Sequence, residues 1–234
     1  MSRLTETLLD LLFPPKCPFC GELLEHSGIC ERCEAALPWT EEEEQELRLP
    51  GGWRCIAPLW YEEAAREAIL QFKFNGAEEK ADLFGQLMAQ CAADRYSGAF
   101  DTVTWTPVSR HRRRKRGYDQ AKLLAEAACR RWSTRPKELL RKTVDNPTQS
   151  GLSGAAARRA NVLGVYQSLH PEEIRGRRIL LIDDIVTTGA TLAEAARELS
   201  QSGAAEVVCM ALARTREGRS AEGKNGPAEQ IKNT

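Results

Sequence analysis

The sequence has no apolar run that approaches the roughly 18–20 residues of a membrane-spanning helix. Its most apolar terminal stretch, residues 4–13, is short, is interrupted by Glu6 and Asp10, and lacks a cleavage site. We therefore expect this stretch to form an amphipathic helix rather than a signal peptide. Together these absences predict a cytoplasmic protein without a membrane span.

The sequence also lacks net charge, because its 33 Lys and Arg residues are balanced by 33 Asp and Glu residues. A balanced chain has no overall attraction to nucleic acid, so any such role must lie in a local cluster of charge. There is an acidic cluster at residues 41–44 and a basic one at residues 110–116. With 234 residues, 42% of them hydrophobic, the chain is long enough for one ordinary domain and a small second one.

Cysteine is present in a pattern that indicates a metal site. Four of the eight cysteines form two Cys-x-x-Cys pairs, CPFC and CERC, and the other four are scattered among apolar residues as expected for small core side chains. Two pairs can supply four thiolates in a closed tetrahedron, which is the arrangement of structural zinc. A redox role for one pair is the competing interpretation, but redox folds lack a second pair at matching spacing. The predicted zinc ligands are Cys17, Cys20, Cys30 and Cys33.

Residues 178–192 read RILLIDDIVTTGATL and organise the rest of the chain. The four apolar residues 179–182 form a run without polar alternation, which is typical of a parallel strand covered on both faces. Two carboxylates follow at once, then a loop of small hydroxylated residues, then the apolar spacing of a helix from Leu192 onward. Open α/β sheets bind ligands at this place, where a strand ends and a helix begins.

The chemistry of this stretch suits a ribose 5-phosphate. Backbone N–H groups of the loop and the positive end of the following helix favour a phosphate dianion, and three threonines add hydroxyl donors. Gly189 allows the backbone to approach the ligand closely. The carboxylates of Asp183 and Asp184 can accept hydrogen bonds from a sugar diol beyond the phosphate.

Other interpretations of the stretch fit less well. A P-loop requires Lys after its glycine, whereas Gly189 is followed by Ala190. A phosphatase of the Asp-x-Asp type requires acids two positions apart, whereas these are adjacent. An ordinary strand, turn and helix with a Thr-rich cap is the simplest alternative, but adjacent acids at a buried strand end are costly without a function.

The segment ILLIDDIVTTGATL resembles the phosphoribosyl pyrophosphate motif of type I phosphoribosyltransferases. The resemblance implies a Rossmann-like α/β domain with a parallel sheet. It also implies that Asp183 and Asp184 are the catalytic acids and hold the ribose hydroxyls, while the loop wraps the 5-phosphate. The ligand-binding residues matched position for position are Asp183, Asp184, Thr187, Thr188, Gly189, Ala190 and Thr191.

The remaining segments predict an alternating α/β order. Residues 40–50 read as a charged linker that ends in Pro-Gly-Gly and marks a domain boundary. We expect strands at residues 54–61, 100–108 and 206–215, and helices at residues 62–74, 78–94 and from Gln120 onward. Lys73, near the end of the first of these helices, is either a ligand contact or only a helix-end cation.

The basic cluster follows the strand at residues 100–108 and is expected to be a loop. It contains six cations in seven positions. A pyrophosphate-binding loop, a solvated charge run and a nucleic-acid patch all fit its charge, and Tyr118 and Trp105 lie near enough in sequence to offer stacking faces to single-stranded DNA. The residues of the cluster with these candidate roles are Arg110, Arg112, Arg113, Arg114, Lys115 and Arg116.

Residues 142–166 are rich in small and polar residues, with Pro147, Gly151 and Gly154 in the first half. This composition predicts a mobile lid at residues 146–154, with Arg158, Arg159 and Asn161 on a helical second half. The polar tail at residues 217–234 is expected to be disordered.

Several segments taken in order resemble the ComF family of competence-associated proteins, especially its ComFC branch. They are the four-cysteine segment, LPW, RRKRGYDQA, NPTQSGL followed by RRAN, and IDDIVTTGAT. The resemblance implies a zinc-finger module at residues 1–50, a phosphoribosyltransferase domain at residues 51–216, and a link to DNA uptake in natural transformation. The family commonly has Phe-Asn where this chain has Tyr118-Asp119, so the role of Asp119 stays open.

Two functions of different class follow from the resemblance. One is a phosphoribosyltransferase that displaces pyrophosphate from phosphoribosyl pyrophosphate, with Mg²⁺ bridging ribose hydroxyls and pyrophosphate. No side chain is an obvious nucleophile, so catalysis would depend on positioning and charge stabilisation. The other is a sensor or DNA-handling adaptor that retains the site, with single-stranded DNA and competence proteins as partners. The intact loop favours ligand binding under both.

Overall fold

The fold is built around a parallel sheet whose central strand is β7 (Arg178–Val186). The computed structural model describes residues 14–26, 28–74, 80–144 and 163–216. Strand β7 lies between β8 (Glu206–Arg214) and β4 (Thr102–Trp105), and it is parallel to both. On the far side of β8, β2 (Arg54–Ile56) and β3 (Leu59–Trp60) also pair with it in parallel. The predicted α/β fold with a parallel sheet is confirmed.

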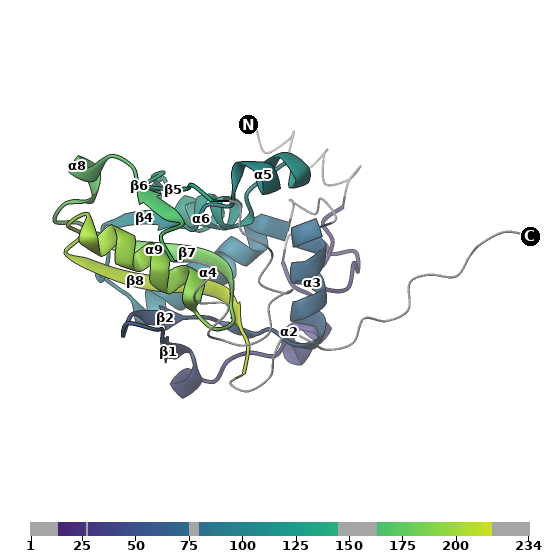
Figure 1. Cartoon of the computed structure of the whole chain (residues 1–234). Coiled ribbons are helices and arrows are strands. Elements are labelled where there is room, and N and C mark those ends of the chain that lie inside the picture. The colour runs from purple at the N-terminus through teal and green to yellow at the C-terminus, as the bar shows by residue number, and fades with distance from the viewer. Residues whose placement is uncertain (1–13, 27, 75–79, 145–162, 217–234) are drawn as a thin grey trace, which may run out of the picture.

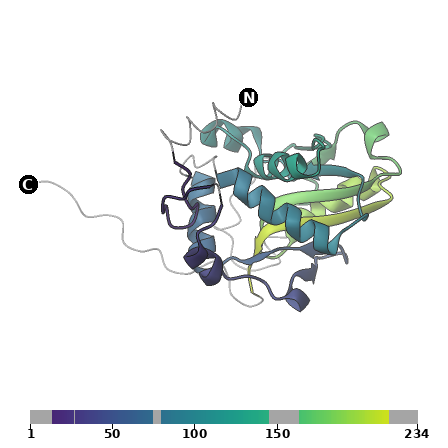
Figure 2. The same ribbon diagram turned by 180° about the vertical axis from the view of Figure 1, so that it is seen from behind.

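Both faces of the sheet are covered, which explains why β7 is apolar without alternation. Leu180 and Ile182 pack into one core with α4 (Lys80–Arg95) and α6 (Gln120–Arg131). Ile179 and Leu181 pack into a second core with α9 (Ala190–Gln201). Figure 1 shows α9 in front of the sheet, and Figure 2, seen from behind, shows α4 and α6 over the opposite face.

The N-terminal module packs against the α/β domain through α4. Its short helix α2 (Glu31–Ala36) is capped by Cys30, whose sulfur accepts a hydrogen bond from the backbone N–H of Cys33. The Phe19 ring lies 5.8 Å from the Phe84 ring of α4, and Lys80 donates a hydrogen bond to the carbonyl of Pro18. The four cysteines are therefore attached to the main core rather than separate from it.

The segment expected as a charged linker carries secondary structure. It contains the 3-10 helix η1 (Glu42–Glu44) and strand β1 (Glu46–Arg48), which pairs antiparallel with β2 at the edge of the sheet. Leu49 is buried beyond β1. The linker interpretation is wrong for residues 46–48, because they form a short edge strand that its charged residues concealed. The division into domains at residue 50 stays a prediction.

The basic cluster forms a helix, not the expected loop. Helix α5 (Arg110–Arg116) begins at Ser109, whose hydroxyl accepts a hydrogen bond from the N–H of Arg112, and it ends at Gly117 with φ 89°. Both residues are typical helix boundaries. The run of cations gave no apolar periodicity, so only the caps signalled the helix.

The other expected elements are present with shifted bounds. Helix α3 (Glu63–Phe74) replaces the predicted helix at residues 62–74, and the helix starting at Gln120 is confirmed. Sequence patterns missed the short antiparallel pair β5 (Leu140–Lys142) and β6 (Tyr166–Ser168), and the one-turn helix α8 (Pro171–Ile174). The predicted N-terminal helix, lid and tail lie outside the described residues. No described helix has the length and hydropathy needed to cross a bilayer.

Candidate functional site

The two acids lie where the sheet loses one of its strands. The pairing of β4 with β7 ends at Trp105 and Ile182, whereas β7 continues beside β8 to Val186. Asp183 and Asp184 are therefore still within the strand, one and two residues beyond the last β4 pair. Because β4 no longer covers that edge, a ligand can approach β7 from the carboxyl end of the sheet.

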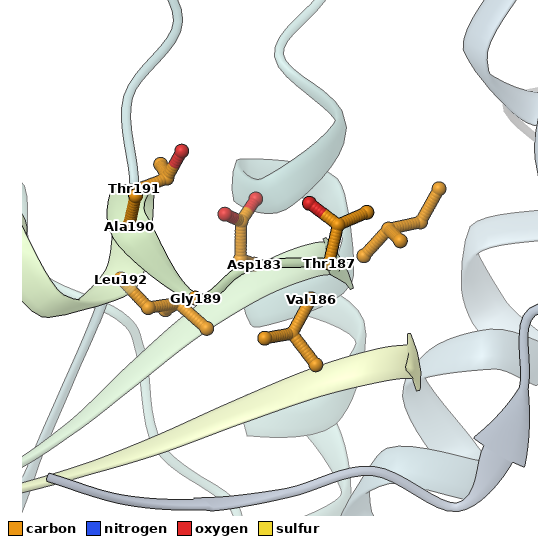
Figure 3. Close-up of a pocket in the computed structure, with 8 residues that line it drawn as sticks. Asp183, Val186, Thr187, Gly189, Ala190, Thr191 and Leu192 are labelled. Atoms are coloured by element: carbon orange, nitrogen blue, oxygen red, sulfur yellow. The ribbon is translucent and has the colours of Figure 1, made fainter. Parts of the chain in front are cut away.

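A pocket follows directly from this edge. In Figure 3 the oxygens of Asp183, Thr187 and Thr191 point to the same side of the loop, while Val186 and Leu192 point away from it. Helix α9 begins beneath them without a side-chain cap, so its positive end faces the pocket. The pocket is lined by Asp183, Ile185, Val186, Thr187, Gly189, Ala190, Thr191 and Leu192.

Gly189 has a conformation that favours glycine, and there is little space for a side chain. Its φ is +70°, in the left-handed region that side chains avoid. A Cβ there would lie 2.7 Å from Cδ2 of Leu49 and 3.2 Å from Cδ of Pro50, so the Leu49 side chain would have to move. The loop between β7 and α9 is therefore supported from below by the residue that follows edge strand β1.

The two carboxylates point to different partners because neighbouring residues in a strand alternate in direction. Asp183 lines the pocket, and its Oδ1 accepts the backbone N–H of Asp184 at 2.8 Å. Asp184 is 8% exposed, and its Oδ2 lies 2.8 Å from Nζ of Lys73 on α3. Lys73, which the sequence left between two interpretations, is therefore paired with the second acid.

Thr188 differs from the other loop threonines. Its hydroxyl oxygen is buried and has no hydrogen-bond partner among the described residues, and the residue does not line the pocket. The pocket thus contains five of the seven predicted ligand-binding residues, namely Asp183, Thr187, Gly189, Ala190 and Thr191.

The acid in the pocket is held partly protonated near neutral pH. Burial, with the neighbouring Asp184 carboxylate second, raises the pKa of Asp183 to about 7, against the lowering effects of Thr106 and Lys73. In an unfolded chain the same carboxyl would titrate near 4. The folded state therefore gains stability from this group at low pH, and that gain disappears as the pH rises from about 4 to about 7.

The first prediction follows from this shift. Asp183→Asn should increase the free energy of unfolding relative to the unmodified protein at pH 8, because the neutral amide avoids the cost of a buried carboxylate. The advantage should fall by up to about 1.4 kcal/mol per pH unit below pH 7 and level off near pH 4. Urea denaturation of both proteins across this pH range measures the difference between their free energies of unfolding. Groups that titrate in the same way in both proteins do not contribute to this difference. An advantage that is constant with pH, or that grows towards acid, would contradict the assignment.

The basic helix has two faces. Arg112 and Arg116, one helical turn apart, are half-buried, and Arg116 lies near Asp184, as its electrostatic interaction with that carboxylate indicates. The other four cations are exposed: Arg110, Arg113, Arg114 and Lys115. Of the six predicted residues, Arg116 is therefore the one with a described interaction with the acids, and Arg112 lies one turn earlier on the same face of α5.

The aromatic residues expected to stack on DNA are not available for it. Trp105 is 5% exposed in strand β4, and Tyr118 is 9% exposed with its hydroxyl bonded to the carbonyl of Phe72. Both rings belong to the core, so their predicted stacking role is wrong. Asp119 is also structural: its carboxylate accepts the N–H of Val108 and caps α6 through the N–H of Lys122.

The four N-terminal cysteines have the geometry of a metal site. Their sulfur atoms all lie within 4.8 Å of one another, and the sulfurs of Cys20 and Cys30 are 3.6 Å apart. Tetrahedral zinc with bonds of about 2.3 Å places its ligands about 3.8 Å apart, so the cluster fits one ion. Four thiolates fill the coordination sphere, which makes the zinc structural.

Two family models match parts of the chain. Residues 116–227 match a phosphoribosyl transferase domain, and residues 8–44 match a double zinc ribbon domain. The first match includes the acids, the Thr/Gly loop and α9, and the second includes all four clustered cysteines.

Similar proteins are known from several bacteria. DNA utilization protein YhgH of Escherichia coli O6:H1 is 31% identical over 209 residues, which cover 85% of this chain and 84% of that protein. Competence protein ComFC of Bacillus subtilis is 29% identical over 192 residues, which cover 82% of this chain and 74% of that protein. Competence protein F of Haemophilus influenzae is 35% identical over 117 residues, about half of each chain. The chain belongs to the ComF family, with a zinc ribbon module joined to a phosphoribosyltransferase-type α/β domain.

Proposed function

We propose that the protein binds phosphoribosyl pyrophosphate together with Mg²⁺. The observation that carries the proposal is the pocket at the start of α9, where a carboxylate and two threonine hydroxyls face the same space. Helix N–H groups and hydroxyls can bind the 5-phosphate of this ligand, and carboxylates can accept hydrogen bonds from the diol of its ribose.

The residues have separate parts in this proposal. Thr187, Thr191 and the backbone around Gly189 bind the 5-phosphate, and Asp183 and Asp184 accept hydrogen bonds from the ribose hydroxyls. Carboxylate and phosphate oxygens are the ligands that Mg²⁺ prefers, and a bound Mg²⁺ would neutralise part of the pyrophosphate charge. Arg112 and Arg116 supply positive charge from the inner face of α5.

Recognition of the sugar phosphate is tested by calorimetric titration of the full chain with ribose 5-phosphate and with ribose. Ribose 5-phosphate should bind and ribose should not, because the phosphate contacts provide the charge-assisted hydrogen bonds. The proposal would be overturned if ribose 5-phosphate and ribose bound equally well, or if ribose 5-phosphate did not bind.

The reaction we propose is transfer of the phosphoribosyl group to an acceptor, with release of pyrophosphate. The residues around the pocket include no Ser, Cys or His placed as a nucleophile within the described chain. Positioning and charge stabilisation would therefore carry the chemistry. A catalytically silent sensor or DNA-binding adaptor is the alternative, and it would bind the same ligand without turnover.

The names of the relatives support a role in handling DNA. We propose a cytoplasmic protein that acts with the competence machinery during DNA uptake. The exposed side of α5 favours weak, sequence-independent binding of single-stranded DNA, because four of its cations are exposed to solvent.

The second prediction separates the two faces of α5. For single-stranded DNA, the logarithm of the binding constant falls with the logarithm of salt concentration by a slope of about 0.7 for each phosphate contact. Replacing the exposed Arg113, Arg114 and Lys115 with Gln should therefore reduce this slope by about two. Affinity for phosphoribosyl pyrophosphate should stay the same. Fluorescence anisotropy with an oligonucleotide at several salt concentrations measures the slope.

The matched control replaces the two inward cations, Arg112 and Arg116, with Gln. This variant should lose affinity for phosphoribosyl pyrophosphate and keep most of its DNA salt slope. If the outward variant retains its slope, the exposed face of α5 does not bind DNA.

A further inference from the structure

Lys73 forms a partly buried ion pair that the fold maintains over a long sequence distance. Its Nζ lies 2.8 Å from Oδ2 of Asp184, and the two side chains are only 19% and 12% exposed. Removing two such charges from water is costly, and the attraction between them offsets that cost only when their geometry is good. The pair therefore points to a function beyond stability.

The end of α3 that carries Lys73 is held by the turn between α5 and α6. The hydroxyl of Tyr118 donates to the carbonyl of Phe72, and Nε2 of Gln120 donates to the carbonyl of Lys73 at 3.3 Å. These two bonds satisfy carbonyls at a helix C-terminus, where no intrahelical partner exists. They also restrict where the Lys73 side chain can reach.

Gln120 connects Lys73 to the basic helix. Its side chain is 1% exposed, and its Oε1 accepts a hydrogen bond from Nη1 of Arg116 at 3.0 Å. One buried amide therefore joins the last arginine of α5 to the backbone of Lys73. Both cations act on the same carboxylate, since Arg116 also interacts electrostatically with Asp184.

Two cations lie close to Asp184. They are Lys73 and Arg116, and the Tyr61 side chain next to them interacts with Lys73, Arg66 and Asp184. The opposing carboxyls are Asp184, Asp183 and Asp119; burial raises the pKa of Asp183 to about 7, so this carboxyl does not carry a full negative charge near neutral pH. When hydroxyl groups of a ligand occupy Asp184, the ammonium of Lys73 is left beside an arginine and needs a new anionic partner.

We propose that Lys73 is a ligand-binding residue that exchanges Asp184 for the diphosphate group of phosphoribosyl pyrophosphate, and that Gln120 is the positioning residue that aligns Lys73 with Arg116. The inference rests on the proposed function, because it identifies which part of that ligand each residue contacts. It separates two halves of the site: the Thr/Gly loop recognises the 5-phosphate, and the Lys73–Gln120–Arg116 group recognises the diphosphate.

The test compares two ligands that differ in the diphosphate. In calorimetric titrations with Mg²⁺, Lys73→Met should weaken binding of phosphoribosyl pyrophosphate by about 10- to 100-fold, the value of a hydrogen bond to a charged group. Affinity for ribose 5-phosphate should change less than about threefold. Lys73→Arg keeps the charge and should restore most of the discrimination.

Gln120→Glu tests the positioning role. The carboxylate still accepts from Arg116 but cannot donate to the carbonyl of Lys73, so the variant should lose part of the preference for the diphosphate ligand while ribose 5-phosphate binds as before. Thermal unfolding of each variant shows whether it is folded, and Lys73→Arg provides a second folded variant.

The outcomes distinguish this inference from the function on which it rests. An unmodified protein that binds neither ligand overturns the proposed function. If it binds both, and Lys73→Met weakens them by the same factor or weakens neither, the assignment of Lys73 to the diphosphate is wrong. An unchanged ratio of the two affinities in Gln120→Glu overturns the positioning role.

Discussion

Removal of zinc should have the largest effect on the structure of this protein. Purified protein should contain about one equivalent of zinc per chain, and Cys17→Ser or Cys33→Ser should lose it. Structural zinc contributes roughly 10–16 kcal/mol of binding free energy to small modules, and most of the module's folding depends on it. Within the described residues, few large apolar side chains of the module belong to the main core, among them Phe19 and Leu37. Residues 14–37 should therefore become accessible to protease, whereas strand β1 should stay paired with β2.

The loss should extend into the α/β domain through α4 and through the backbone contacts of Pro38 and Trp39 with β3. Phe19 and the Pro18 carbonyl contact Phe84 and Lys80, so the midpoint of thermal unfolding should fall modestly while the sheet stays folded. Cys129→Ser is the matched control, because Cys129 is a buried thiol outside the cluster. Metal analysis by mass spectrometry decides the question, and full retention of zinc in both cluster variants would refute the four-cysteine site.

The second large effect is on ligand binding. Asp183→Asn combined with Asp184→Asn should weaken Mg²⁺-dependent binding of phosphoribosyl pyrophosphate by on the order of 10²- to 10⁴-fold. Each lost charged acceptor is worth roughly 1.5–3 kcal/mol, and 1.4 kcal/mol corresponds to tenfold. The fold should survive, because Asn has the same shape and the strand is held by its neighbours β4 and β8.

The two single variants should differ in stability although both weaken binding. Asp184→Asn removes the partner of Lys73 and should lower the unfolding midpoint, whereas Asp183→Asn should raise it at pH 8. Asp94→Asn, an exposed carboxylate on α4, is the control for a general effect of charge. Unchanged ligand affinity in the double variant would refute the ribose site.

The parts of the site that were predictable from sequence are local. The apolar run, the acids, the loop and α9 are consecutive, so their order alone places them at one strand end. The four cysteines were also recognisable, because each pair is a local unit with fixed spacing. In both cases the geometry depends on few long-range contacts.

The parts that were not predictable depend on long-range contacts or on weak local signals. The pairing of Lys73 with Asp184 joins α3 to β7 across 111 positions and has no local signature beyond a cation near a helix end. Gln120 gave no signal, since its role depends on two other elements meeting at its amide. Strand β1 was concealed by charged residues that an edge strand tolerates.

Calorimetric titration of the full chain with phosphoribosyl pyrophosphate, once with Mg²⁺ and once with EDTA, tests the central claim most directly. We expect one site per chain, with binding that is saturable in Mg²⁺ and is weakened at least tenfold in EDTA, because uncompensated pyrophosphate charge would face Asp183 and Asp184. Absence of heat at millimolar ligand in both titrations, confirmed by an unchanged unfolding midpoint, would contradict a phosphoribosyl pyrophosphate site at the end of β7.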